Sequence, residues 1–193
     1  MKNEVRLIGG LFKRRKLPVA DKPGLRPPPD RVRETLFNWL GQDLSGWRVL
    51  DAFAGTGALG FEAASRGAAE VLLLERDGEL VASLNATKVR LKADNVRVER
   101  ADAMAWLRRA GPAAFEAVLL DPPFDAELGV AALAAAVPLL VEGGYVYLEG
   151  PAPVRDPPAG LEAHRQARAG AVHYQLFRRG YTAAVDASPR NPP

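Results

Sequence analysis

Short apolar runs alternate with longer helix-forming stretches over most of this 193-residue chain, and this alternation restricts the possible folds more than any other feature. The longer stretches are rich in alanine and leucine. Such alternation is typical of a parallel sheet covered by helices on both faces. The expected strands contain residues 49–50, 71–74, 96–98, 117–120 and 145–148, and the expected helices span 58–66, 79–91, 103–109 and 127–141.

Both ends of the chain depart from this pattern. Residues 161–179 should add two antiparallel strands at the sheet edge, which gives a doubly wound, mainly parallel seven-stranded sheet. Near the N-terminus, glycines and a run of basic residues predict a short hairpin, and prolines in residues 22–29 predict an extended linker. Asp30 is then expected to cap a helix that ends at Gly41.

We therefore expect three regions. Residues 1–41 form a basic hairpin, a linker and a helix that pack on the main domain. Residues 42–181 form the main α/β domain, and the tail 182–193 is expected to be disordered because it has few apolar anchors.

Composition narrows the classes of function. The chain has no cysteine, which excludes disulfides, thiolate metal sites and a cysteine nucleophile. His164 and His173 have no partner at metal-ligand spacing, so we expect no metal. No apolar run approaches the roughly 20 residues that cross a bilayer, and the N-terminus lacks the apolar stretch of a signal peptide. We expect a cytoplasmic protein that does not bind membranes.

The positive charge is concentrated at one end. Residues 1–40 hold ten Lys/Arg and four Asp/Glu, a net charge of +6, whereas the remainder holds 16 and 19, a net charge of −3. This asymmetry predicts an anion-binding arm. Four of the basic residues are consecutive: Lys13, Arg14, Arg15 and Lys16. They would either contact RNA phosphates or form a solvated rim of the hairpin.

The sequence VLDAFAGTGALG combines a buried strand, a glycine turn and the start of a helix. Glycines let the backbone approach a ligand at a helix N-terminus, where N–H groups are free. Gly55, Gly57 and Gly60 match the dinucleotide-binding fingerprint. Glu75 lies 20 residues beyond Gly55 and could accept both hydroxyls of an adenosine ribose. NAD and S-adenosylmethionine (SAM) both fit, but Asp51 favours SAM, because a carboxylate repels a pyrophosphate and attracts a cationic sulfonium.

Asp102 follows the third expected strand and directly precedes the helix that begins near Ala103. Its carboxylate could bond the exocyclic amine of adenine, and it could also cap the helix. The two roles are compatible, so both stay open.

The fourth expected strand ends in Asp121, Pro122, Pro123 and Phe124. The prolines remove two N–H donors, which leaves the Asp121 carboxylate and the Pro122 carbonyl as acceptors. Two adjacent acceptors suit an –NH₂ group and would turn its lone pair toward an incoming methyl group. Phe124 offers a flat face for stacking a base. Taken alone, the tetrapeptide could equally be an ordinary turn with a core phenylalanine.

Together these motifs resemble the amino-methyltransferases that modify nucleic-acid bases. Four N-terminal segments more narrowly resemble the bacterial 16S rRNA (guanine-N2)-methyltransferase family: RLIGG (6–10), RKLP (15–18), GLRP (24–27) and DRVRETLFNWL (30–40). The likeness extends from about residue 5 to residue 179. It implies a monomeric SAM-dependent enzyme that methylates a guanine of small-subunit rRNA, either naked or in the assembling subunit.

The resemblance also implies roles for individual residues. Asp121 to Phe124 would be catalytic. Arg31 and Arg33 would join the basic run in RNA binding, or would be solvated helix residues. Pro28 and Pro29 stand where we expect a threonine, which removes a hydroxyl contact to the SAM carboxylate. The expected cofactor-binding residues are Asp51, Phe53, Gly55, Thr56, Gly57, Glu75, Arg76, Asp102, Ala103, Arg26 and Asp30.

Three other functions stay open. An adenine-N6 methyltransferase acting on DNA or RNA is the nearest, because the same tetrapeptide serves any planar amine. An NAD-dependent oxidoreductase is disfavoured by Asp51. A non-enzymatic RNA-binding assembly factor is disfavoured by the intact Asp121 and the glycine turn.

Overall fold

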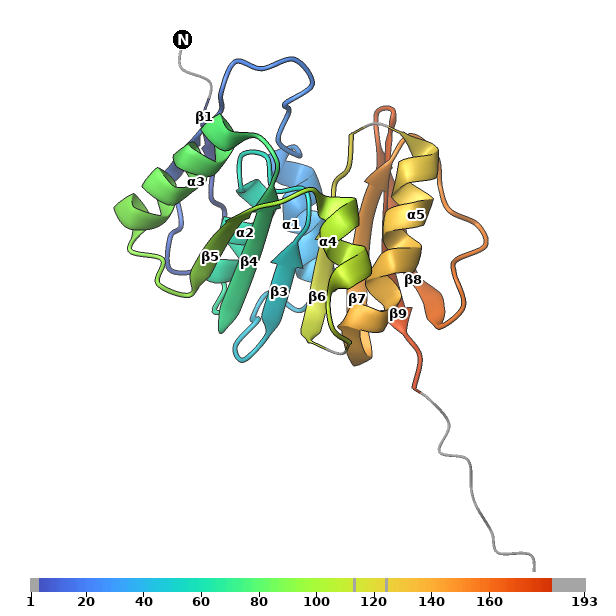
Figure 1. Ribbon diagram of the computed structural model, residues 1–193. Helices are drawn as coiled ribbons and strands as arrows, with labels where there is room; N and C mark the ends of the chain where they lie inside the picture. Colours follow the sequence, from blue (N-terminus) through green and yellow to red (C-terminus); the bar gives the residue numbers. More distant parts are fainter. Residues whose placement is uncertain (1–3, 113, 124, 182–193) are drawn as a thin grey trace, which may run out of the picture.

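The computed structural model of the protein describes residues 4–112, 114–123 and 125–181 (Figure 1). The expected tail 182–193 and Phe124 lie outside the described residues. The helices are α1 (Asp30–Trp39), α2 (Ala58–Ser65), α3 (Gly78–Leu91), α4 (Ala103–Arg109) and α5 (Ala126–Ala136), followed by the 3₁₀ turn η1 (Val137–Leu139). In the part of the chain that is described, no helix has the length and apolar character needed to span a membrane.

The described strands form two sheets. A small antiparallel sheet joins β1 (Glu4–Arg6) to β2 (Lys16–Pro18), which confirms the predicted N-terminal hairpin. The large sheet contains β3 (Arg48–Asp51), β4 (Glu70–Glu75), β5 (Val96–Arg100), β6 (Phe115–Leu120), β7 (Leu140–Gly150), β8 (Leu161–Ala169) and β9 (Val172–Arg179).

The large sheet has the order β5-β4-β3-β6-β7-β9-β8. The first five strands in this order are parallel, and β9 is antiparallel to both β7 and β8. The predicted seven-stranded, mainly parallel sheet is therefore confirmed. The chain moves from β3 outward to β5 and then returns to the other side of β3 with β6. Ligands of open α/β sheets bind at such a reversal, outside the carboxyl ends of the strands.

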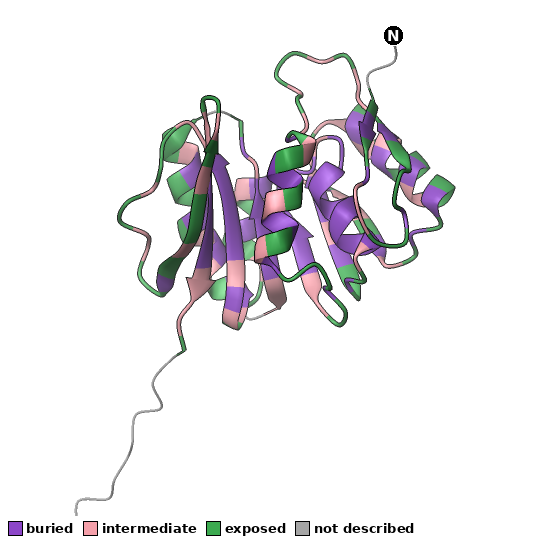
Figure 2. Ribbon diagram, turned by 180° about the vertical axis from the view of Figure 1, so that it is seen from behind, coloured by how far each residue is buried: buried purple, intermediate pink, exposed green. Residues whose placement is uncertain are grey.

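Helices cover both faces of the sheet, as the alternation predicts. On one face, Phe37 of α1, Phe61 of α2 and Leu84 of α3 belong to one apolar core. On the other face, Leu107 of α4 and Leu133 of α5 belong to a second core. Figure 2 shows the strands buried between these layers, whereas α1, α3, α4 and α5 each expose an outer face and α2 is buried along its whole length.

The N-terminal segment is part of the first core. Val5, Leu7 and Leu17 of the hairpin region pack in the same cluster as Val32 of α1 and Phe61 of α2. The hairpin thus adds apolar surface to the main domain, and burial of such surface stabilises the attachment. A domain boundary at residue 41 stays a prediction.

Two local expectations are wrong. Asp30 does not cap α1, because Pro29 occupies the cap position without a side-chain hydrogen bond, and Asp30 is the first helical residue. The helix expected over 127–141 ends at Ala136. Pro138 lies in the following 3₁₀ turn, and Leu140 already pairs with Phe115 in the sheet. A proline disrupts α-helical hydrogen bonding, and the neighbouring strand offers the next residues another partner.

Candidate active site

A cavity of about 930 Å³ opens at the carboxyl ends of the parallel strands. Four of the carboxylates that line it come from the ends of four different strands: Asp51 at the end of β3, Glu75 at the end of β4, Asp102 beyond β5 and Asp121 after β6. Parallel strands place their carboxyl ends on one edge of a sheet, which is why residues far apart in sequence meet here. The structure thus brings the two predicted motifs, the glycine turn and the Asp121 tetrapeptide, to one cavity.

The glycine turn needs its glycines for different reasons. Gly55 and Gly57 have φ angles of +51° and +77°, in the left-handed region that disfavours other residues. A Cβ atom at Gly57 would lie 2.6 Å from the Phe61 ring. A Cβ atom at Gly60 would lie 2.1 Å from Leu73 of β4, so Gly60 permits close packing of α2 on the sheet. Gly55 lines the cavity, whereas Gly57 is not among the residues that line it.

Asp51 is a buried carboxyl group beside this turn, with an exposed fraction of 1%. The backbone N–H of Gly60 donates a hydrogen bond to its Oδ2 atom at 2.9 Å. Its Oδ1 atom has no hydrogen-bond partner among the described residues. Burial raises the pKa of Asp51 to about 7. A cationic amino group in the cavity would satisfy this oxygen and stabilise the carboxylate, so the site fits a ligand that carries one.

Glu75 fastens the glycine turn to the end of β4. Its Oε2 atom accepts a hydrogen bond from the Gly55 N–H at 3.0 Å, and its Oε1 atom accepts one from the Asp77 N–H at 2.9 Å. Each carboxylate oxygen can accept a second hydrogen bond, so both can still receive a ribose hydroxyl. Arg76 follows Glu75 in the cavity wall.

Asp102 is an N-cap, the structural role that the sequence left open. Its Oδ1 atom accepts a hydrogen bond from the Ala105 N–H at 2.8 Å, at the start of α4. It also lines the cavity together with Ala103, so capping leaves the second oxygen available to a ligand.

The proline-rich linker forms another wall of the cavity. Residues 22–29 all line it, including Arg26 and the prolines that replace the expected threonine. Asp30 is not among the lining residues. Lys22 attaches the linker to α3, since its Nζ atom lies 2.6 Å from Asp77 and 2.7 Å from Glu79. The hydrogen bonds to these two carboxylates raise the pKa of Lys22. Sequence analysis did not identify Lys22, because its partners are 55 and 57 residues away.

Asp121 follows β6 and lines the cavity together with Pro122 and Pro123. Burial raises the pKa of Asp121 well above its ordinary value, and the nearby charges of Glu149 and Asp51 raise it further. The fourth residue of the tetrapeptide, Phe124, lies outside the described residues, so its stacking role stays a prediction.

Glu149 is a cavity residue that sequence analysis missed. It lies near the end of β7, its exposed fraction is 5%, and its Oε1 atom accepts a hydrogen bond from the Tyr147 hydroxyl at 2.8 Å. Burial raises the pKa of Glu149 to about 7. The sequence pattern could have identified Glu149, since it comes at the end of an apolar strand just as Asp51 and Glu75 do.

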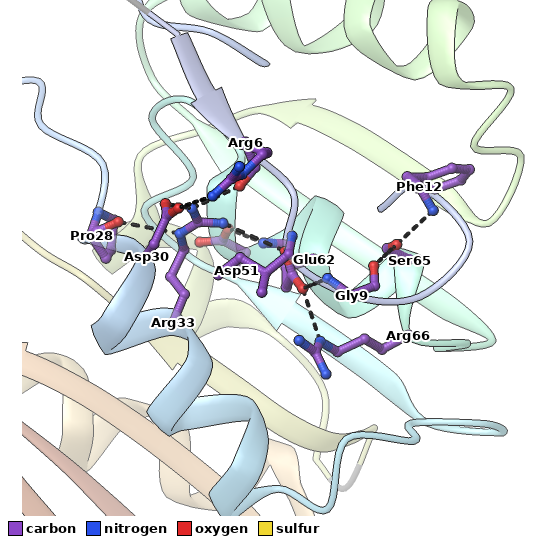
Figure 3. Close-up of polar contacts among 12 residues, drawn as sticks. Arg6, Gly9, Phe12, Pro28, Asp30, Arg33, Asp51, Glu62, Ser65 and Arg66 are labelled. Atoms are coloured by element: carbon purple, nitrogen blue, oxygen red, sulfur yellow. Dashed lines mark hydrogen bonds and ion pairs between the residues drawn. The ribbon is translucent and has the colours of Figure 1, made fainter. Parts of the chain in front are cut away.

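The predictions that Arg33 binds RNA or is a solvated helix residue are wrong for this structure, because its side chain is fully buried. Figure 3 shows the polar contacts that surround it. Its guanidinium donates to the carbonyl oxygens of Arg6 at 2.8 Å and Pro28 at 3.2 Å. It also pairs with Asp30 at 2.6 Å and approaches Glu62 of α2 at 3.5 Å. Arg33 therefore connects the hairpin, the linker and the main domain.

Glu62 is the buried acceptor at the centre of this network, and no sequence pattern pointed to it. Its two carboxylate oxygens accept hydrogen bonds from the backbone N–H groups of Ile8 and Gly9, both at 2.8 Å. Arg66 donates to it at 2.9 Å. Figure 3 shows these contacts between the hairpin region and α2.

The four consecutive basic side chains are exposed around the turn between β1 and β2. Lys16 pairs with Glu4 at 2.8 Å. The turn is anchored on the end of α2, because the backbone N–H groups of Leu11 and Phe12 donate to the carbonyl and the hydroxyl of Ser65. Arg31 is exposed on α1. Their contacts with RNA stay predictions.

The sheet order, the glycine turn and the row of strand-end carboxylates define a Rossmann-like domain of the methyltransferase class. A family model described as Conserved hypothetical protein 95 matches residues 5–178, and the chain belongs to this family.

Several relatives of the chain are named Ribosomal RNA small subunit methyltransferase D. Ribosomal RNA small subunit methyltransferase D of Escherichia coli (strain K12) is 42% identical over 192 residues, which is 95% of this chain and 94% of the relative. The protein of the same name from Haemophilus influenzae is 37% identical over 188 residues, or 92% and 95% of the two chains. A solved structure from Escherichia coli, described as a methyltransferase, superposes with a TM-score of 0.84 at 40% identity, covering 92% of this chain and 99% of the other.

Proposed function

We propose that the protein transfers the methyl group of SAM to the exocyclic N2 amine of a guanine in small-subunit rRNA. The observation that carries the proposal is the shared cavity, because the glycine turn and Asp121 both line it. The RNA substrate is supported by the names of the relatives, which are small-subunit rRNA methyltransferases. A protein that modifies rRNA works where ribosomal subunits assemble, so we expect to find it in the cytoplasm. We also expect it to be a monomer.

The residues of the cavity fit SAM. Glu75 would accept the ribose hydroxyls, and Asp102 would accept the adenine amine. Asp51 has a buried oxygen without a hydrogen-bond partner among the described residues, which suits the cationic amino group of the methionine part. At the N-terminus of α2 the N-cap Gly57 has no side chain to cap the helix, and Asp51 takes the N–H of Gly60, so the N–H groups of the first helical residues would be left to a ligand at the glycine turn. When bound, SAM would supply a methyl group already activated by its sulfonium.

The contribution of the chain would be positioning and electrostatics. The Asp121 carboxylate and the Pro122 carbonyl would each accept one hydrogen of the guanine amine and direct its lone pair at the methyl group. A carbon–nitrogen bond forms as the carbon–sulfur bond breaks, and S-adenosylhomocysteine is the product. The amine loses one proton after transfer, and Asp121 already accepts a hydrogen bond from it. Asp121 therefore need not be a strong base before the reaction.

The test is to incubate the protein with methyl-labelled SAM and either naked small-subunit rRNA or assembled subunits, and to map the label. The expected product is N2-methylguanosine at one nucleotide. Label in N6-methyladenosine would replace the proposal by the adenine alternative, which the same tetrapeptide could serve. Calorimetry should show binding of SAM and S-adenosylhomocysteine and none of NAD. Binding of NAD alone would contradict the cofactor assignment.

A further inference from the structure

Glu149 is a buried acid in the cavity that the proposed reaction does not use. Burying a carboxyl group is costly unless its oxygens find partners. Among the described residues, the Tyr147 hydroxyl is its one hydrogen-bond partner, and it occupies Oε1. The second oxygen, Oε2, is left to accept a hydrogen bond from a ligand.

Glu149 and Asp121 occupy matching positions on adjacent parallel strands. Leu120 of β6 is in register with Leu148 of β7, so the residues that follow them, Asp121 and Glu149, are neighbours across the sheet. Adjacent strands are about 4.8 Å apart, and side chains at matched positions share a face. The Glu149 charge also contributes to raising the pKa of Asp121, which is consistent with close approach. Two carboxyl groups at this spacing can meet one edge of a flat base.

The neighbouring atoms of the base amine distinguish guanine from adenine. In guanine the ring nitrogen N1 beside the N2 amine carries a hydrogen and donates, whereas in adenine the N1 beside the N6 amine has no hydrogen and accepts. A carboxylate next to the group that holds the amine would therefore bond guanine and repel adenine.

We infer that Glu149 accepts the N1–H of the target guanine, next to the amine held by Asp121, and thereby selects guanine over adenine. This inference rests on the proposed function. Burial raises the pKa of Glu149 to about 7, and the Tyr147 hydroxyl lowers it. A hydrogen bond donated by N1–H favours the ionised form in the same way, so guanine stabilises the acceptor that recognises it.

The test uses 2-aminopurine, which keeps the 2-amino group but has an unprotonated N1. Small-subunit rRNA is prepared by splinted ligation with guanosine, 2-aminopurine or adenosine at the nucleotide that the mapping experiment identifies, as naked RNA and in reconstituted subunits. Wild-type protein should methylate guanosine about 10- to 100-fold faster than 2-aminopurine, because 2-aminopurine cannot donate the charge-assisted hydrogen bond.

Glu149→Gln should reverse this preference. Its amide keeps the size of the side chain and can donate to the unprotonated N1. Guanosine methylation should fall about 10- to 100-fold while 2-aminopurine methylation rises relative to it. Glu162→Gln, an exposed glutamate on β8, is the matched control and should change neither rate. S-adenosylhomocysteine affinity and the thermal midpoint should stay near wild type in both variants.

The outcomes distinguish a failure of the role inferred for Glu149 from a failure of the proposed function. If wild-type protein methylates guanosine but Glu149→Gln slows guanosine and 2-aminopurine by the same factor, Glu149 does not read N1, and the proposed function stands. If wild-type protein methylates adenosine in place of guanosine, both are overturned. If Glu149→Gln fails to fold, the wild-type comparison still decides: equal rates on guanosine and 2-aminopurine would overturn the inference. Tyr147→Phe keeps the Glu149 carboxyl group but removes the hydroxyl that donates a hydrogen bond to it. This variant should reduce the preference for guanosine over 2-aminopurine several-fold.

Discussion

The carboxylate of Glu75 accepts a hydrogen bond from the backbone N–H of Gly55 at 3.0 Å, which joins the end of β4 to the turn after β3. This contact explains why the two residues can act together although 20 residues separate them. The parallel pairing of β3 with β4 sets the two strand ends side by side, and the hydrogen bond fixes the turn. Glu75 therefore shapes the cavity and also lines it.

Replacing Glu75 with Ala should weaken S-adenosylhomocysteine binding about 10- to 100-fold, because the change removes both a hydrogen-bonded carboxylate and the anchor of the turn. Turnover at saturating SAM should change less, since the effect is mainly on ground-state binding. Isothermal titration calorimetry and initial rates measure the two effects. Glu162→Ala is the control, and equal affinities for the two variants would contradict the ribose assignment.

Asp121→Ala should reduce the rate of methylation more than the affinity for the cofactor, which is the opposite of Glu75→Ala. Single-turnover methylation of the RNA should fall at least about 100-fold, because the target amine is no longer held. S-adenosylhomocysteine affinity should stay within about threefold of wild type, since Asp121 would contact the base more than the cofactor. A variant that retained its single-turnover rate would show that Asp121 is not catalytic.

Asp51 should make the stability of the ligand-free protein depend on pH. Its folded-state pKa is raised from 3.8 to about 7. In the unfolded chain the carboxyl ionises near pH 4, whereas in the folded protein it stays protonated until about pH 7. Its contribution to the free energy of unfolding is thus complete below about pH 4, falls as the pH rises to about 7, and is absent above.

Asp51→Asn isolates this contribution from the other buried acids. Asp121 and Glu149 have raised pKa values and act in the same direction, whereas the lowered pKa values of Asp77 and Glu116 act in the opposite direction. The variant should lose stability less steeply between pH 5 and 7, by up to about 1.4 kcal/mol for each pH unit, and should bind SAM more weakly. Urea unfolding at several pH values measures the slope; identical slopes in both proteins would disprove the assignment.

Arg33→Ala should destabilise the fold by about 3 kcal/mol, because it leaves buried acceptors and part of the Glu62 charge without a partner. Arg31→Ala is the matched variant on the same helix and should change the free energy of unfolding by less than about 0.5 kcal/mol, since Arg31 is exposed. Urea unfolding compares the two. If Arg33→Ala were as stable as wild type and instead bound RNA more weakly, the structural role of Arg33 would be refuted.

Neutralising Lys13, Arg14, Arg15 and Lys16 together should weaken RNA binding most at low salt. The slope of log affinity against log salt should fall by about 0.7 to 0.9 for each phosphate that the protein no longer neutralises. S-adenosylhomocysteine affinity should be unchanged, because none of the four lines the cavity proposed to bind SAM. Neutralising the exposed pair Arg108 and Arg109 of α4 is the control. An unaltered RNA affinity and an unaltered salt slope would show that the four basic residues form a solvated rim of the hairpin and do not contact RNA.

The sequence by itself determined the architecture and the two motifs of the site. Strands and helices were predictable because their signals lie within one element, such as the period of apolar residues or the glycine turn before α2. The carboxylates Asp51, Glu75 and Asp121 were predictable for the same reason, since each ends an apolar strand and parallel strands share one edge.

Only the tertiary structure decided which charged residues are buried and what they contact. Arg33 looked like its exposed neighbour Arg31, but its contacts with Glu62 and Arg6 span 29 and 27 residues. Glu149 came close to Asp121 only through the pairing of β6 with β7. Local sequence reports the helix or strand that a residue belongs to. The environment of its side chain depends on elements packed from distant parts of the chain, and that packing sets whether a charge faces solvent, a partner or the cavity.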